Sequence, residues 1–94
     1  GFNGAELLAL AIGGCLANDL RYVATDLGAR IEAIAIDVAL TLEGDPLLAT
    51  AAEVRVSAEG PDPQAIAEAI GRARAESTVA NSIARGLPVA FVSV

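Results

Sequence analysis

Apolar side chains recur at helical spacing over the first part of the chain, at Leu8, Ile12, Leu16, Leu20, Val23 and Leu27. This spacing predicts a long helix with one buried stripe. Asn3 followed three residues later by Glu6 is typical of a capping box, so the helix begins there, and Gly28 is a suitable residue to end it.

The two halves of this helix differ in polarity. From Ala5 to Ala17 nearly every residue is apolar or small, and polar side chains first appear from Asn18 onward. We therefore expect the first half to be buried on most sides and the second half to emerge from the core. Gly13 and Gly14 interrupt the first half and cost about 1 kcal/mol each relative to alanine. Their presence predicts close approach of another backbone just before Cys15.

The pattern changes to strict alternation in the middle of the chain. Apolar residues occupy every second position from Ile34 to Leu42 and again from Ala52 to Ala58, with Gly44, Asp45 and Pro46 between the two runs. Alternation with period two predicts half-buried strands, and the turn residues predict an antiparallel hairpin with one wet face.

Two more helices and a strand are expected after the hairpin. Asp62 before Pro63 predicts the start of a helix that carries Ile66, Ile70 and Ala73 on one stripe, and Ser77 continues that stripe. Ser77 and Thr78 restart a short helix through Ile83, which Gly86 and Pro88 end before a last strand, Val89 to Val94. The element order predicts one α+β domain over residues 1–94, with a nearly all-apolar helix on an antiparallel sheet. Three strands are few for that helix, so we expect further strands from a partner or from a preceding segment.

Composition narrows the classes of function. The chain has 12 acidic residues against 6 basic ones, a net charge of −6, and only 3% aromatic residues. A negative chain without stacking platforms is a poor partner for nucleic acid and for anionic membranes. The longest apolar run, Leu7 to Ala17, is short for a membrane span and has no basic leader before it, so we expect a cytoplasmic protein.

Cys15 is the only cysteine, and the chain has no histidine. An internal disulfide, the usual zinc and haem ligand sets, and Ser-His or Cys-His catalysis are therefore excluded within this chain. We expect no cofactor and no metal. Thiol chemistry and carboxylate chemistry remain as catalytic resources.

Two stretches resemble the OsmC-like superfamily, which comprises the osmotically inducible protein C and the organic hydroperoxide resistance proteins. The first is Gly1-Phe2-Asn3-Gly4, Gly13-Gly14-Cys15 and Asn18-Asp19-Leu20, which is similar to the central-helix signature of a subgroup that opens with Gly-Phe-Asn-Gly. The second is Asn81-Ser82-Ile83 with Gly86-Leu87-Pro88-Val89, similar to the C-terminal segment of the family. The resemblance covers the whole chain and corresponds to the C-terminal two-thirds of a family member, without the N-terminal strands.

The resemblance implies an intertwined homodimer with a curved sheet and two sites near the interface, each with a reactive cysteine at the position of Cys15. In the peroxidase members this thiolate attacks an organic hydroperoxide and becomes a sulfenic acid, which a second cysteine closes into a disulfide for reduction by an external dithiol. This chain departs from the pattern at three points. Ser77 stands at the second cysteine, Ala5 stands where those members carry a glutamate although Glu6 is adjacent, and the activating arginine belongs to the N-terminal segment.

Each candidate residue has a plainer interpretation. Cys15 is either a peroxidatic nucleophile or a small hydrophobe in an apolar helix, with Asp19 one turn later opposing ionisation. Glu6 either orients an activating arginine or only caps the helix. Ser77 either binds substrate or caps the short helix.

The polar pair Asn18-Asp19 either lines a pocket beside the thiol or marks where the helix reaches water. Arg21 and Arg85 are either solvated helix ends or stand in for the missing arginine. Two functions follow for the whole chain: a thiol-dependent peroxidase related to hydroperoxide reductases, or a non-catalytic OsmC-like dimer that binds a small hydrophobic ligand or has a structural role.

Overall fold

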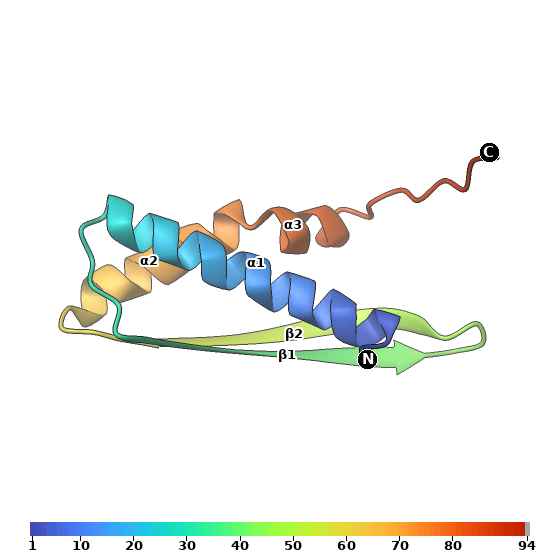
Figure 1. Cartoon of the computed structure of the whole chain (residues 1–94), viewed down its shortest axis with the longest axis horizontal. Coiled ribbons are helices and arrows are strands. Elements are labelled where there is room, and N and C mark those ends of the chain that lie inside the picture. The colour runs from blue at the N-terminus through green and yellow to red at the C-terminus, as the bar shows by residue number, and fades with distance from the viewer. Residues whose placement is uncertain (94) are drawn as a thin grey trace.

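The computed structural model describes residues 1–93 and contains a hairpin with three helices on one face. The elements are α1 (Gly4–Asp26), β1 (Ala33–Glu43), β2 (Leu48–Glu59), α2 (Pro63–Glu76) and α3 (Thr78–Ala84). The helices lie above the two antiparallel strands, with α1 and α2 side by side (Figure 1). The predicted α+β class is confirmed, with a sheet of two strands over the described residues.

The predicted signals at both ends of α1 are confirmed. Asn3 Oδ1 accepts from the Glu6 N–H at 2.8 Å, and the Asn3 N–H donates to Glu6 Oε1 at 3.2 Å, which completes the capping box. At the other end Gly28 adopts a positive φ of 69°. Its N–H donates to the Thr25 carbonyl, and the Ala29 N–H donates to the Ala24 carbonyl, which is the Schellman pattern.

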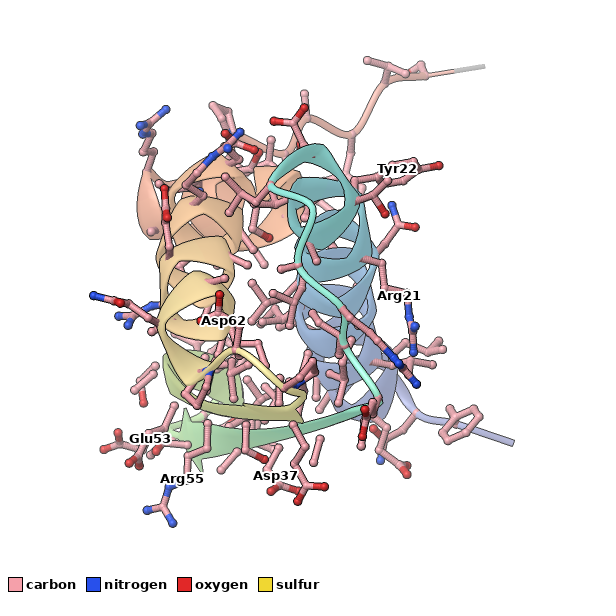
Figure 2. All side chains as sticks on the ribbon, turned by 90° about the vertical axis from the view of Figure 1, so that its left-hand side faces the viewer. Arg21, Tyr22, Asp37, Glu53, Arg55 and Asp62 are labelled. Atoms are coloured by element: carbon pink, nitrogen blue, oxygen red, sulfur yellow. The ribbon has the colours of Figure 1, made fainter. Side chains whose placement is uncertain are left out.

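The hairpin is longer than the alternation predicted, but it has the expected pairing. Ile36 lies opposite Val56 and Val38 lies opposite Val54, with a register shift between Thr41 and Leu42. Along β1 the partly buried residues alternate with exposed ones from Ile34 to Leu40, as expected for one wet face. Figure 2 shows Asp37, Glu53 and Arg55 on the outer, wet face of the sheet.

The core lies between the second half of α1, α2 and the near ends of the strands. Its buried members are Leu16, Leu20, Val23, Ala24, Ala69 and Ala73. Asp62 Oδ1 caps α2 by accepting from the Gln64 and Ala65 N–H groups, as the Asp-Pro pair predicted. From this start α2 packs Ala69 and Ala73 into the core beside α1.

The expected distribution of burial along α1 is wrong. Leu20 in the second half is 0% exposed, whereas Leu7 and Leu10 in the first half are 51% and 58% exposed. The reason is the position of α2, which packs over the second half of α1 and leaves the outer side of the first half uncovered. Polarity along one helix does not reveal which part of it a distant element will cover.

Gly13 and Gly14 of α1 have different surroundings, and neither has another backbone as its neighbour. A Cβ on Gly13 would lie 3.3 Å from Val38 Cγ2 and 3.6 Å from Ile36 Cγ2, so side chains of β1 account for this glycine. A Cβ on Gly14 would meet nothing within 4 Å. The expected backbone approach is therefore not found within the described protomer.

The predicted last strand is also not found. Residues 89–93 are irregular, and Val94, the last residue of the predicted strand, lies outside the described residues. After Gly86 the chain leaves the helices and extends away from the hairpin (Figure 1), which leaves Phe91 98% exposed. A β-strand forms only when it pairs with the edge of another strand, and residues 87–93 reach no strand edge within one protomer.

Length and composition do not exclude α1 as a membrane span, contrary to the expectation from the Leu7–Ala17 run. The helix has 23 residues, and the mean hydropathy of its most apolar stretch is 1.3. The core helix of a soluble protein meets the same criterion, and α1 forms one side of the core here.

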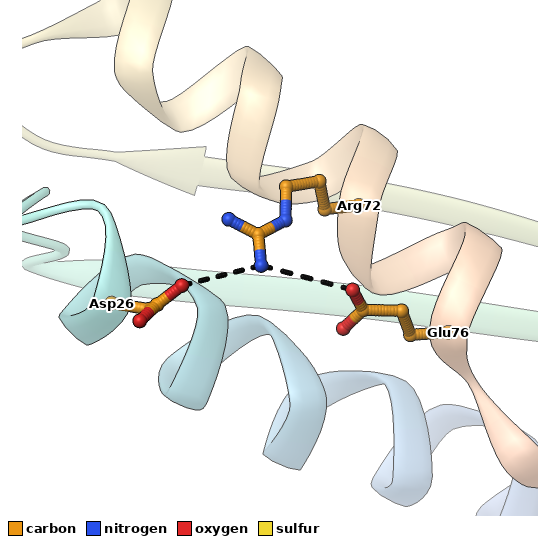
Figure 3. Close-up of polar contacts among 3 residues, drawn as sticks. All are labelled: Asp26, Arg72 and Glu76. Carbon is orange, nitrogen blue, oxygen red and sulfur yellow. Dashed lines mark hydrogen bonds and ion pairs between the residues drawn. The ribbon is translucent and has the colours of Figure 1, made fainter.

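An ion pair that the sequence did not predict joins the end of α1 to α2. Arg72 Nη2 lies 3.3 Å from Asp26 Oδ2 and 3.7 Å from Glu76 Oε1 (Figure 3). Because these side chains are more than a third exposed, solvent screening limits each pair to about 0–1 kcal/mol. The pair therefore contributes little to the stability of the fold.

Gly60, just after β2, allows the chain to pass close to Arg30, just before β1. A Cβ there would overlap the Arg30 carbonyl oxygen and lie 2.9 Å from Ile66 Cδ1. We expect Gly60→Ala to lower the free energy of unfolding by roughly 1–3 kcal/mol, since neither backbone can move without breaking contacts. Gly71→Ala, at a helical position with nothing within 4 Å, should instead raise it by up to about 1 kcal/mol. Urea unfolding of both variants measures this, and equal effects would contradict it.

Candidate functional site

Cys15 lies in the middle of α1 as a free, partly buried thiol. Its Sγ donates to Asp19 Oδ2 at 3.8 Å, one helical turn further along. Only the protonated sulfur can donate, so ionisation breaks this contact and leaves two anions one turn apart. Asp19 thus lies beside the thiol, at the one-turn spacing expected from the sequence.

The flank of α1 that carries Cys15 is the one next to α3. Leu8 lies seven residues before Cys15 and so on the same side of the helix, two turns earlier. Leu8 lines a groove together with Ile83 and Ala84 of α3 and with residues of β2. The thiol thus lies on the side of α1 that faces α3 of the same chain.

Glu6 lies on the other side of α1. It is nine residues from Cys15, which at 3.6 residues per turn places the two side chains about half a turn apart and about 13 Å apart along the axis. Glu6 lines a different groove, with Arg21 at its far end, and Cys15 is not among the residues that line it. The structure therefore does not bring the two candidate catalytic residues together within one protomer. Glu6 acts as the capping-box residue.

Ser77 separates α2 from α3 and is fully buried. It occupies the cap position of α3, but its side chain makes no capping hydrogen bond, and among the described residues its hydroxyl has no partner. It lines a groove with Ile12 and Leu16, which flank Cys15 in the sequence. Because its Oγ has almost no accessible surface, a ligand reaches this hydroxyl only if α3 moves.

Asn81 has a role that the sequence motif alone did not reveal. Its Nδ2 donates to the carbonyls of Arg74, Ala75 and Ser77, at 3.3, 3.2 and 2.7 Å. These carbonyls belong to the end of α2 and to the residue after it, where helical partners run out. Asn81 therefore holds the junction of α2 and α3, and with it Ser77.

The remaining polar candidates lie at the surface. Arg21 projects from α1 on the side away from α2 (Figure 2), Arg85 follows α3, and Asn18 is exposed. Arg21 and Arg85 pair with no carboxylate within residues 1–93, and Arg21 lies on the flank of Glu6. No described contact brings either arginine to the thiol of Cys15.

Comparison with known protein families identifies the family of this chain. The OsmC-like protein family matches residues 1–92, which is nearly the whole chain. The chain belongs to the OsmC-like family. No curated protein matches it. OsmC-like proteins are generally soluble and linked to the response to peroxide and other stress, and the resemblance noted at the two sequence motifs is confirmed.

Replacement of the Asp19 carboxylate should change the reactivity of the Cys15 thiol. We expect Asp19→Asn to raise the rate of alkylation of Cys15 by iodoacetamide roughly two- to five-fold at neutral pH, because a partly screened negative charge is removed from beside the forming thiolate. Asp26→Asn, on the same helix but eleven residues away, is the matched control and should leave the rate unchanged. An unchanged rate for Asp19→Asn would show that the 3.8 Å contact has no electrostatic effect.

The orphaned hydroxyl of Ser77 gives a second expectation. Ser77→Ala should raise the free energy of unfolding by about 1 kcal/mol, because a buried polar atom without a partner costs about 1–3 kcal/mol and the smaller side chain recovers most of it. For a domain of this size the melting temperature would rise by about 4–8 °C. The exposed Ser57→Ala should change it little. A lower melting temperature would mean that the hydroxyl is hydrogen-bonded in solution.

Proposed function

We propose that this OsmC-like chain is a thiol-dependent peroxidase that reduces organic hydroperoxides, with Cys15 as the peroxidatic residue. The observation that supports it is membership of the OsmC-like family over residues 1–92, with the only cysteine inside the long central helix. The thiol is free and partly buried, which suits a sulfur that must be reached by a small apolar peroxide and shielded from bulk solvent.

The first chemical step is a two-electron oxidation of sulfur. The Cys15 thiolate attacks the distal oxygen of the hydroperoxide, an S–O bond forms, and the O–O bond breaks. The leaving alkoxide takes a proton and becomes the alcohol, so the peroxide is reduced and Cys15 becomes a sulfenic acid. Ionisation of the sulfur must first break its contact with Asp19.

Recycling requires an external dithiol, because Ser77 occupies the place of the family's second cysteine and Cys15 is the only thiol. One sulfur of the dithiol attacks the sulfenic sulfur and releases water, which gives a mixed disulfide. The second sulfur attacks that disulfide, leaves the reductant oxidised and returns Cys15 as a thiol. A cytoplasmic location, where such dithiols are kept reduced, suits this cycle.

Consumption of cumene hydroperoxide in the presence of dithiothreitol tests the proposal. The wild type should turn over, and Cys15→Ser should lose at least a hundred-fold in rate, because a hydroxyl cannot be oxidised in this way. Glu6→Gln, which keeps the capping box but removes the charge, should retain the rate if Glu6 only caps the helix. Equal rates for wild type and Cys15→Ser would rule out the peroxidase.

A non-catalytic role as an OsmC-like dimer that binds a small hydrophobic ligand is the second candidate. The favouring observation is the apolar groove of about 410 Å³ between α1, the two strands and α3, lined by Leu8, Leu40 and Ile83 among others. A fluorescent aliphatic probe bound there with unchanged affinity in Cys15→Ser, together with no peroxide consumption, would favour this role.

A further inference from the structure

A groove of about 380 Å³ between α1, β2 and the end of α2 has no part in the proposed thiol chemistry, since Cys15 does not line it. Its walls are apolar, with Leu16 of α1 and Val54 of β2 among the residues that form them. Its two polar lining residues, Arg74 and Ser77, both lie at the α2 end. An apolar cleft with a few converging polar groups is typical of a site for a small molecule.

Ser77 gives an independent indication that a bound group belongs in this groove. Its side chain is fully buried, and its Oγ has no hydrogen-bond partner within residues 1–93. A buried polar atom without a partner costs about 1–3 kcal/mol, which an alanine at this position would avoid. The serine is explained when an acceptor from outside the chain completes its hydrogen bonding.

Arg74 determines the charge of the bound group. It is exposed, it is the only charged residue that lines this groove, and it pairs with no carboxylate within residues 1–93. Arg72, by contrast, is held by Asp26 and Glu76. Ser77 follows Arg74 by three residues, so both side chains lie on the same side of the end of α2. The groove therefore offers a free guanidinium beside a free hydroxyl.

One guanidinium and one neutral hydroxyl match a group with a single negative charge and two acceptor oxygens. A carboxylate meets both requirements, because its two oxygens can accept from the two side chains at once. A phosphate dianion would leave a second charge unpaired beside apolar walls, which is costly. The remainder of the groove is lined by aliphatic side chains, so it suits an aliphatic tail.

We infer that this groove is a binding site for a small aliphatic carboxylate. One carboxylate oxygen accepts from the Ser77 hydroxyl and the other from the Arg74 guanidinium, and the tail lies between Leu16 and Val54. The start of α3 shifts as the ligand enters, because the Ser77 Oγ is covered in the chain alone. This movement falls to α3 because, unlike α1 and α2, it has no capping hydrogen bond from a side chain at its start.

Calorimetric titration with octanoate and with octylamine tests the head group. The two probes have the same tail, but at neutral pH the first is an anion and the second a cation. The wild type should bind octanoate roughly ten-fold more tightly, because the charge in the groove is that of Arg74. The net charge of −6 favours the cation elsewhere on the surface, so a preference for the anion reports the local site. No binding of octanoate, or equal binding of both probes, would overturn the inference.

A matched pair of arginine variants tests the position of the anion. Arg74→Gln should weaken octanoate binding roughly ten-fold, because a charged hydrogen bond is lost, and Arg85→Gln should bind like the wild type. Arg85 is also exposed and unpaired within residues 1–93, but it lines a neighbouring recess beside Ser77 and not this groove. Circular dichroism shows whether each variant keeps its helices. Wild-type affinity in Arg74→Gln, or an equal loss in Arg85→Gln, would overturn the inference.

A matched pair of serine variants tests the hydroxyl. Ser77→Ala should weaken octanoate binding roughly five-fold, whereas the exposed Ser57→Ala should not change it. The expected gain in stability of Ser77→Ala means that weaker binding cannot be attributed to unfolding. Wild-type affinity in Ser77→Ala would show that only water meets this hydroxyl, and would overturn the site.

The thiol variant separates this inference from the proposed function. Cys15→Ser should bind octanoate like the wild type whatever its peroxide turnover, because Cys15 does not line the groove. Octanoate binding without peroxide turnover would refute only the peroxidase. Peroxide turnover without octanoate binding would refute only the carboxylate site.

Discussion

Covering α1 is the constraint on which this fold depends. The helix is apolar over most of its circumference from Ala5 to Ala17, yet one protomer covers it with a two-stranded sheet, α2 over its second half, and the short α3. The second half of α1 therefore supplies the core, and the first half keeps Leu7 and Leu10 in solvent.

Features set by residues close in the sequence were predictable. The capping box at Asn3 and Glu6, the positive φ at Gly28 and the Asp-Pro start of α2 each involve hydrogen bonds over three or four positions, so the residue types alone determine them. The hairpin was predictable from the period-two alternation and from the turn residues between its strands, although the strands extend beyond the alternating residues.

Features that depend on distant elements were not predictable. Which half of α1 is buried depends on where α2 packs, and the strand expected at Val89 depends on an edge that residues 87–93 do not reach within one protomer. The candidate site divides in the same way. Sequence and resemblance identified Cys15 and its neighbour Asp19, and the nine-residue spacing on one helix already places Glu6 on the other flank. The burial of Ser77 and the hydrogen bond from Asn81 to its carbonyl required the structure.

The proposed site lacks a positive partner for its sulfur. An enzyme built on Cys15 needs a positive charge near its thiolate, whereas the side chain that the sulfur contacts here, Asp19, has the opposite sign. Arg21 lines the groove that also contains Glu6, and Cys15 is not among the residues of that groove, so no described contact brings this positive charge to the sulfur. Activation of the thiolate therefore has to come from a positive group that makes no described contact with the sulfur in this protomer.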